Sequence, residues 1–294
     1  MEAINLSSPT RANLLSLQNT TSLIGRTQER LATGLKVNNA IDDALAFFKA
    51  RNLNARASDL STIKNQISNA VSTIKASIQG LETIEDILKQ MRALAQSAIS
   101  SPESTTRAKL ASQFNELRTQ VDNVAEDAHF NGYNLLKNTS EKFTAGADQL
   151  TVKFNERTGP TLVNTLVVSG LRAADFRRIT AQSAVAVGSG SAVWGQTGNA
   201  AVAAIRSAIT AIDSALVTVR QSAQSFGTQS AVLQIRIDFT QRIINTLHGG
   251  ASSLVNADLN QESANLLSLQ TRQELGTISL SVAQKSDQAV LSLF

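Results

Sequence analysis

The segment at residues 205–247, IRSAITAIDSALVTVRQSAQSFGTQSAVLQIRIDFTQRIINTL, decides the fold that this sequence predicts. Apolar and small side chains recur along it at alternating intervals of four and three residues, which is the period of one face of an α-helix. The positions are Ile205, Ile209, Ile212, Leu216, Val219, Ala223, Phe226, Ser230, Leu233, Ile237, Thr240, Ile244 and Leu247. A face maintained over about six heptads is typical of long helices that pack side by side in a coiled coil or bundle.

Three earlier segments, at residues 14–35, 60–95 and 110–128, repeat this spacing. Ser101 and Pro102 separate the last two, because serine is a good N-cap and proline suits the first position of a helix. The short turn makes these two helices antiparallel neighbours. We therefore predict a mainly α fold, in which long antiparallel helices form a coiled-coil-like bundle with a small β-hairpin region.

The β-hairpin region is expected where the helical spacing fails, between about residues 131 and 195. Short apolar runs interrupted by glycine, proline and polar residues are typical of strands and turns. The predicted strands lie in KFTAGA (142–147), QLTVKFN (149–155) and TLVNTLVVSG (161–170), with a turn at RTGP (157–160) and a surface connection at 186–199.

The C-terminal segment, residues 257–294, is again helical, but its aliphatic residues spread around most of the helix circumference. A helix that is apolar on several sides requires burial on all of them. Within the chain only the N-terminal helix is left to pack against it. We therefore expect other copies of the chain to cover its remaining faces.

The composition excludes several classes of protein. There is no cysteine, which rules out disulfides, thiol catalysis and Cys-ligated zinc. The net charge of +4 is spread through both signs and aromatic residues make up 4%, so nucleic-acid binding is not expected. The N-terminus lacks the pattern of a cleaved signal, and no run of about 18 apolar residues predicts a membrane span.

Candidate catalytic residues are few. His129 and His248 have no neighbours that complete a metal or nucleophile set, and each precedes residues that we interpret as ending a helix. Asp42 and Asp43 lack the alternating oxygen ligands of a calcium loop, and adjacent side chains in an extended loop point to opposite sides. We therefore predict no enzymatic activity, cofactor or metal, and interpret the aspartates as groups that cap the backbone or contact another subunit.

Three stretches together resemble one family, bacterial flagellin, the subunit of the flagellar filament. RLATGLKVNNAIDDA (30–44) is similar to the family's RLSSGLRINSAKDDA, with Lys36, Val37 and Asn39 in place of Arg, Ile and Ser. FNG followed by two leucines (130–136) resembles the end of the family's N-terminal helical part, and VLSLF (290–294) resembles its terminal VLSLL. The resemblance covers roughly residues 1–137 and 200–294.

The resemblance implies a domain organisation. The terminal helices, residues 1–40 and 250–294, would pair as an inner domain (D0), joined by a spoke connector at 41–57 to a helical rod (D1) at 58–137 and 200–249. Residues 138–199 would be the β-rich part of D1 with a surface loop, and outer domains would be minimal.

The resemblance also implies a non-enzymatic protein that is exported without a cleaved signal by the flagellar type III apparatus. It would join an extracellular filament that serves motility. The implied partners are further copies of the chain, sister flagellins, an export chaperone, and the hook–filament junction and cap proteins. No cofactor is implied.

Two sets of residues are predicted to matter for the filament, one in the contacts between subunits and one in the spoke. The expected self-assembly anchors, each of which could instead serve packing within the chain, are Leu14, Leu17, Ile24, Leu31, Leu266, Ile278, Leu280 and Leu291. In the spoke, Gly34 would end the inner helix, Asn38 and Asn39 would form a turn, and Asp42 and Asp43 would precede re-entry into helix.

A third set concerns the innate receptor TLR5, which recognises some flagellins through an RELA-like stretch and a glutamate. Arg92 and Leu94 match that stretch in part, whereas Gln120 stands where the glutamate would be. Because a charge-assisted contact is lost, we expect weak or no recognition.

Two alternatives remain open at this stage. The hook–filament junction protein shares both terminal regions, although the Asp-Asp loop and the FNG element are more similar to flagellin. The other alternative is a protein of a different class, either an enzyme or a signalling helical hairpin. The sequence contains no convincing active site for an enzyme, and a signalling hairpin normally has membrane spans.

Overall fold

The computed structural model describes residues 8–137, 148–156, 164–171, 194–196 and 198–291, with the side chains of residues 9 and 287–291 left out. The chain divides into two compact units. Unit 1 comprises Met1–Ala57 and Asn245–Phe294, and unit 2 comprises Ser58–Ile244.

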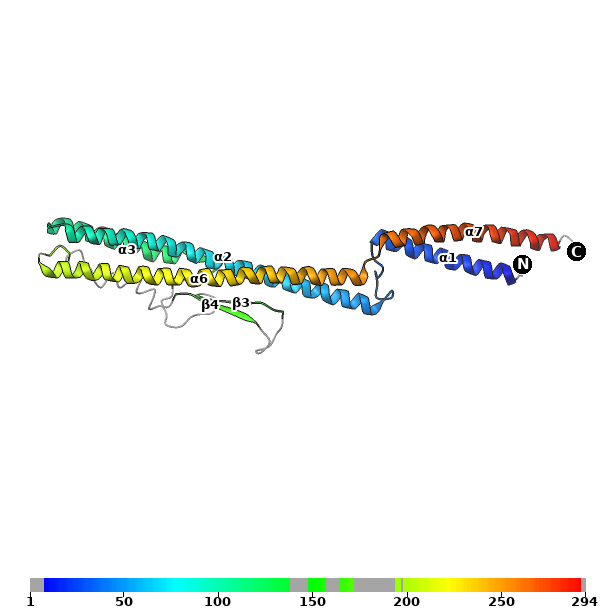
Figure 1. Ribbon diagram of the computed structural model, residues 1–294, viewed down its shortest axis with the longest axis horizontal. Coiled ribbons are helices and arrows are strands. Elements are labelled where there is room, and N and C mark those ends of the chain that lie inside the picture. Colours follow the sequence, from blue (N-terminus) through cyan, green and yellow to red (C-terminus); the bar gives the residue numbers. More distant parts are fainter. Residues whose placement is uncertain (1–7, 138–147, 157–163, 172–193, 197, 292–294) are drawn as a thin grey trace. The chain divides into compact units, whose positions relative to one another are not determined.

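Unit 1 is built on the antiparallel pairing of α1 (Ser8–Thr33) with α7 (Leu259–Leu291), which lie side by side in Figure 1. Near the start of α1, Asn13 Nδ2 donates to Ser279 Oγ at 3.4 Å. Near its end, Arg30 Nη1 donates to Glu262 Oε1 at 3.0 Å. We call α1 and α7 the terminal helix pair.

Unit 2 is a bundle of α3 (Ser104–Asp127) with the larger parts of α2 (Ala44–Ser100) and α6 (Asn199–Val255), whose residues 44–57 and 245–255 belong to unit 1. Figure 1 shows α3 alongside the other two helices. Three polar contacts fix the antiparallel register of α2 and α6, because partners further along α2 lie further back along α6. These contacts are Lys64 Nζ to Gln241 Oε1 at 2.9 Å, Glu85 Oε1 to Arg220 Nη2 at 2.9 Å, and Arg92 Nε to Asp213 Oδ1 at 2.8 Å.

The core of unit 2 contains the apolar face that the sequence predicts along α6. Ile205, Ile212, Leu233 and other members of that face are buried. An 18-residue stretch of α6 reaches a mean hydropathy of 1.6, so its length and composition alone would allow it to cross a membrane. A third of that stretch is buried inside the structure. The predicted mainly α fold with long antiparallel helices is confirmed.

The turn between α2 and α3 differs from the prediction. Ser101 does not cap α3; the N-cap residue is Glu103, whose side chain makes no capping hydrogen bond. The buried guanidinium of Arg107 binds the turn instead, donating from Nη1 to the carbonyl oxygens of Ser101 at 3.0 Å and Pro102 at 2.9 Å. Its Nε donates to the Trp194 carbonyl at 2.9 Å, so one side chain ties two distant segments together.

Two antiparallel hairpins complete the described part of unit 2. β1 (His129–Phe130) and β2 (Tyr133–Asn134) are joined by Asn131 and Gly132, whose positive φ angles of 51° and 84° suit a tight two-residue turn. β3 (Gln149–Lys153) pairs with β4 (Thr165–Ser169), within two of the predicted strand segments. The predicted strand at 142–147, the turn at 157–160 and most of the connection at 186–199 lie outside the described residues.

Helix limits also differ from the sequence prediction. α2 begins at Ala44, so residues 44–57 of the expected spoke are helical. α6 does not end at Gly249 and Gly250 but continues to Val255. Glycine within a helix costs about 1 kcal/mol relative to alanine, and packing of the surrounding helix offsets that cost. His248 therefore does not lie in a last turn; its Nδ1 lies 3.1 Å from Asn54 Oδ1 on α2.

Candidate assembly surface and connector

The connector, which we define as residues 34–43, leaves α1 and enters α2 within unit 1. Gly34 closes α1 with φ 72°, and its N–H donates to the Arg30 carbonyl at 2.8 Å. Glycine suits this position because a side chain is strained at positive φ. The helix therefore ends where the sequence predicts.

The connector is hydrogen-bonded to the segment that joins α6 to α7. Lys36 N–H donates to the Val255 carbonyl at 2.7 Å, and Ala257 N–H donates to the Gly34 carbonyl at 2.9 Å. Leu35 and Asn256 form an isolated antiparallel bridge. The connector and the segment between α6 and α7 therefore form one hydrogen-bonded structure rather than two independent loops.

Asp42 organises the connector backbone. Its Oδ2 accepts hydrogen bonds from the Asn38 N–H at 3.1 Å and the Asn39 N–H at 3.0 Å. These two bonds, the Asn39 one first, lower the pKa of the Asp42 carboxyl below its usual value, because they favour the charged form.

Asp43, in contrast, caps the start of α2. Its Oδ1 accepts a hydrogen bond from the Ala46 N–H at 2.9 Å, which caps the first turn of α2. Asp258 caps α7 in the same way, accepting from the Asn260 N–H at 2.9 Å. Adjacent aspartates thus serve separate parts of the backbone, one the connector and one the helix.

The histidines and acidic residues in the described part of the chain do not gather into a metal site. No group of three His, Asp or Glu side chains that could hold a metal ion occurs in the part of the chain that the structure describes. His129 belongs to β1, and its Nδ1 lies 3.3 Å from the Glu126 carbonyl in the last turn of α3.

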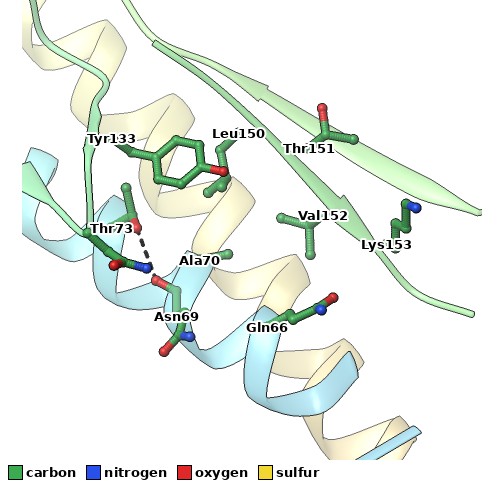
Figure 2. Close-up of a pocket in the computed structure, with 10 residues that line it drawn as sticks. Gln66, Asn69, Ala70, Thr73, Tyr133, Leu150, Thr151, Val152 and Lys153 are labelled. Carbon is green, nitrogen blue, oxygen red and sulfur yellow. Dashed lines mark hydrogen bonds between the residues drawn. The ribbon is translucent and has the colours of Figure 1, made fainter. Parts of the chain in front are cut away.

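Figure 2 shows a groove of about 260 Å³ between α2 and β3. Tyr133 lies beside Leu150, Val152 points toward α2, and Thr151 points away from it. The one titratable group besides Tyr133 in its lining is Lys153. The groove carries no acid–base pair, so its chemistry does not suggest a reaction.

The terminal helix pair leaves much of its apolar surface uncovered. On α1, Ile24 is buried, yet Leu15 is 60% exposed. On α7, Leu267 and Leu275 are 67% and 61% exposed. Contact between the two helices therefore covers one apolar face of each and leaves the aliphatic side chains on the other faces exposed.

The predicted anchors divide between these two environments. Leu14 and Ile278 are exposed, whereas Ile24 is buried within the pair. Leu17, Leu31, Leu266 and Leu280 are half-buried, and the side chain of Leu291 lies outside the described residues. The set of predicted anchors leaves out further exposed positions, which spread around the helices because α7 lacks a single apolar face. They are Leu15, Leu23, Leu259, Leu267, Leu275 and Val282.

The residues considered for receptor contact lie on α2 and α3. Arg92 pairs with Asp213 of α6, Leu94 is half-buried, and Gln120 is exposed. They are not brought together by any contact that the structure records among them.

Comparison with known proteins identifies the family. The bacterial flagellin N-terminal helical region matches residues 4–141, and the bacterial flagellin C-terminal helical region matches residues 209–294. Over its whole length the chain is 32% identical to flagellin FljM and 31% identical to flagellin FljO of Caulobacter vibrioides, and it covers 99% of each.

A solved structure is similar in fold. It is that of a putative flagellar hook-associated protein from Vibrio parahaemolyticus, 16% identical, with a TM-score of 0.55 over 73% of this chain and 100% of that one. The full-length relatives favour flagellin over a junction protein. From the two matched regions and these relatives, we conclude that the chain belongs to the bacterial flagellins, the non-enzymatic structural subunits of the flagellar filament.

Proposed function

We propose that this flagellin polymerises through its terminal helix pair into a filament that serves motility. The observation that carries the proposal is the uncovered apolar surface of α1 and α7. Burial of the exposed parts of Leu267, Leu275 and Val282 on α7 in a subunit contact would stabilise the contact by about 1–2 kcal/mol each.

Contacts of this kind are heterologous, because one face of a subunit meets a different face of the next. Such contacts continue indefinitely when the rotation between subunits does not close a ring. A helical polymer follows, in which residues 1–40 and 250–294 form the inner domain, 41–57 the spoke, and 58–137 with 200–249 the outer rod that carries the β-rich part at 138–199.

Export by the flagellar type III apparatus is part of this proposal. The cysteine-free sequence supports it, because no crosslink can block an unfolded chain in a narrow channel. Secretion into the extracellular filament would bring the chain into contact with an export chaperone, the hook–filament junction and cap proteins, and sister flagellins.

The experiment that tests the proposal is deletion of residues 257–294 from the purified chain. We expect the full chain to form sedimentable filaments without any hook present, as seen by negative-stain electron microscopy. The truncated chain should stay in the supernatant while its far-ultraviolet circular dichroism still shows a helical core over residues 58–247. Normal filaments from the truncated chain would contradict the proposal.

Weak TLR5 recognition is a second, separate proposal. Arg92 is engaged by Asp213 at 2.8 Å, and Gln120 offers no carboxylate. In a receptor reporter assay we expect the monomer to give a weak response that Gln120→Glu increases. A full-strength response from the unaltered monomer would refute this proposal.

A further inference from the structure

The turn between β1 and β2 is the one place in the sequence where a glycine follows an asparagine. Asn131 and Gly132 are both exposed, and the residues on either side of them, Phe130 and Tyr133, are paired. A two-residue turn is held by the hydrogen bonds of its flanking residues, so it does not require the Gly132 N–H. The Gly132 backbone nitrogen therefore lies next in the chain to an exposed side-chain amide without being committed to the turn.

Asn134, in the same hairpin, is held in place. Its side chain makes four hydrogen bonds to backbone groups. They join Nδ2 to the carbonyl oxygens of Ala125 at 2.9 Å and Glu126 at 3.0 Å, and Oδ1 to the N–H groups of Leu136 at 2.9 Å and Lys137 at 3.0 Å. Its neighbour in the chain is Leu135, whose side chain hinders access to the backbone nitrogen. Asn131 instead precedes a residue without a Cβ, and no hydrogen bond between described residues holds its amide.

We propose that Asn131 is a site of spontaneous covalent modification, at which the side-chain amide becomes a carboxylate. The Gly132 nitrogen attacks Asn131 Cγ, and the new N–Cγ bond closes a five-membered succinimide ring. The Cγ–Nδ2 bond breaks, and Nδ2 leaves as ammonia with the proton of the Gly132 N–H. The reaction needs no enzyme, cofactor or oxidant, and the inference is independent of the proposed polymerisation.

Water then opens the ring at one of its two C–N bonds, adding hydroxyl to the carbonyl carbon and a proton to the nitrogen. Opening at Cγ restores the main chain and leaves an aspartate at position 131. Opening at the backbone carbonyl carbon leaves an isoaspartate, in which the main chain runs through the former side chain. Either product adds one negative charge, which lowers the formal net charge from +4 to +3.

The folded turn restrains ring closure. Asn131 has φ 51°, in the left-handed region where ψ is also positive. In that conformation the Gly132 nitrogen lies on the opposite side of the Cα–C bond from the Asn131 side chain, so it cannot reach Cγ. The ring therefore closes only when the turn opens, and the rate of modification depends on how often that local opening occurs.

The two products affect the hairpin differently. Asp-Gly is one of the dipeptides that suit a tight two-residue turn, so the aspartate product can form the same hairpin. The isoaspartate product has one extra atom in the main chain, which disturbs the pairing of Phe130 with Tyr133. Modification before folding would therefore divide the chains into one population that forms this hairpin and one that does not.

Peptide mass spectrometry of the purified full chain tests the site, with Asn134 as the internal control. The chain is incubated at mildly alkaline pH as a folded monomer and in guanidinium chloride. We expect a gain of about 1 Da at residue 131, from replacement of NH₂ by OH, and none at residue 134. The gain should appear at least about tenfold faster in denaturant, where the turn is open in every chain.

Two results would contradict the proposal in different ways. A residue 131 that stays unmodified in denaturant would overturn the site itself. Equal rates in the denatured and folded chains would overturn the control of the reaction by the turn.

A matched variant identifies the reacting bond. Hydroxylamine attacks a succinimide ring and cleaves the chain there, so the expected fragments are residues 1–131 and 132–294. Asn131→Gly lacks the amide but keeps a dipeptide that suits the turn. In denaturant, where folding of the variant does not matter, we expect cleavage of the unaltered chain and none of Asn131→Gly. Resistance of the unaltered chain, or the same fragments from the variant, would overturn the proposal.

Discussion

Arg30 at the end of α1 donates a hydrogen bond to Glu262 in the first turn of α7, with Nη1 and Oε1 3.0 Å apart. The Glu262 side chain is only 12% exposed, whereas that of Arg30 is 33% exposed. The pair therefore ties the end of α1 to the start of α7, close to the hydrogen bond from the Ala257 N–H to the Gly34 carbonyl. A carboxylate in the first turn of a helix also interacts favourably with the helix dipole.

Breaking this pair should weaken the terminal helix pair. We expect a double-mutant cycle of Arg30→Ala and Glu262→Gln, measured by urea unfolding of the monomer, to give a coupling free energy of about 1 kcal/mol. A coupling of zero within error would show that the two side chains act independently.

Gly80 sits where α2 packs against the end of α3. A Cβ atom at this position would lie 2.7 Å from Ala128 Cβ and 2.7 Å from Leu136 Cδ1. Because Ala128 Cβ cannot move without its backbone, we expect Gly80→Ala to lower the free energy of unfolding by about 1–3 kcal/mol. Gly227→Ala on α6 is the matched control, since a Cβ there meets nothing within 4 Å and should stabilise by about 0.5–1 kcal/mol. Chemical denaturation measures both, and equal effects of the two changes would refute the packing argument.

The connector should loosen in acid through Asp42. The N–H groups of Asn39 and Asn38 lower the pKa of the Asp42 carboxyl in the folded chain from its ordinary value of 3.8. Because the folded pKa is lowered, the stabilisation by the charged carboxylate is fully present above the unfolded value of 3.8 and is lost as the pH falls from there through the folded pKa. We expect the amide NMR signals of Asn38 and Asn39 to titrate together with an apparent pKa below 3.8. Asp42→Asn should abolish that titration; its persistence would point to another group.

Asp43 offers a test of helix capping. Replacing it by alanine removes the acceptor for the Ala46 N–H, which should cost about 1 kcal/mol and increase hydrogen exchange in the first turn of α2. Asp43→Asn keeps a side-chain oxygen and should retain most of the protection. If both variants exchange alike, capping is not the role of this side chain.

Much of the fold could be predicted from local pattern. The intervals of four and three residues between apolar positions along 205–247 indicate which face of α6 is buried. This pattern can be recognised without knowing which distant residues the helix contacts. The end of α1 at Gly34 was likewise readable, because glycine at positive φ is a local feature. The Asn131-Gly132 turn was missed, although that dipeptide is a strong hairpin signal.

The remaining features depend on contacts between distant residues. Ser101 has the local pattern of an N-cap, yet the turn is held by the Arg107 guanidinium, which donates to the Ser101 carbonyl. The carbonyl of Trp194, far along the chain, accepts from the same guanidinium and so helps to position it. Gly249 resembles a helix end, but packing carries α6 past it to Val255. Which aliphatic residues of α1 and α7 remain exposed could not be predicted either, since that depends on how two helices without a single apolar face are oriented against each other.

The central claim, that subunits assemble through the terminal helix pair, is tested most directly by a helical reconstruction of the polymerised chain by electron microscopy. We predict a helical filament in which Leu267, Leu275 and Val282, exposed in the single chain, contact neighbouring subunits. A filament in which these side chains face solvent and all contacts between subunits lie in residues 58–244 would contradict the account.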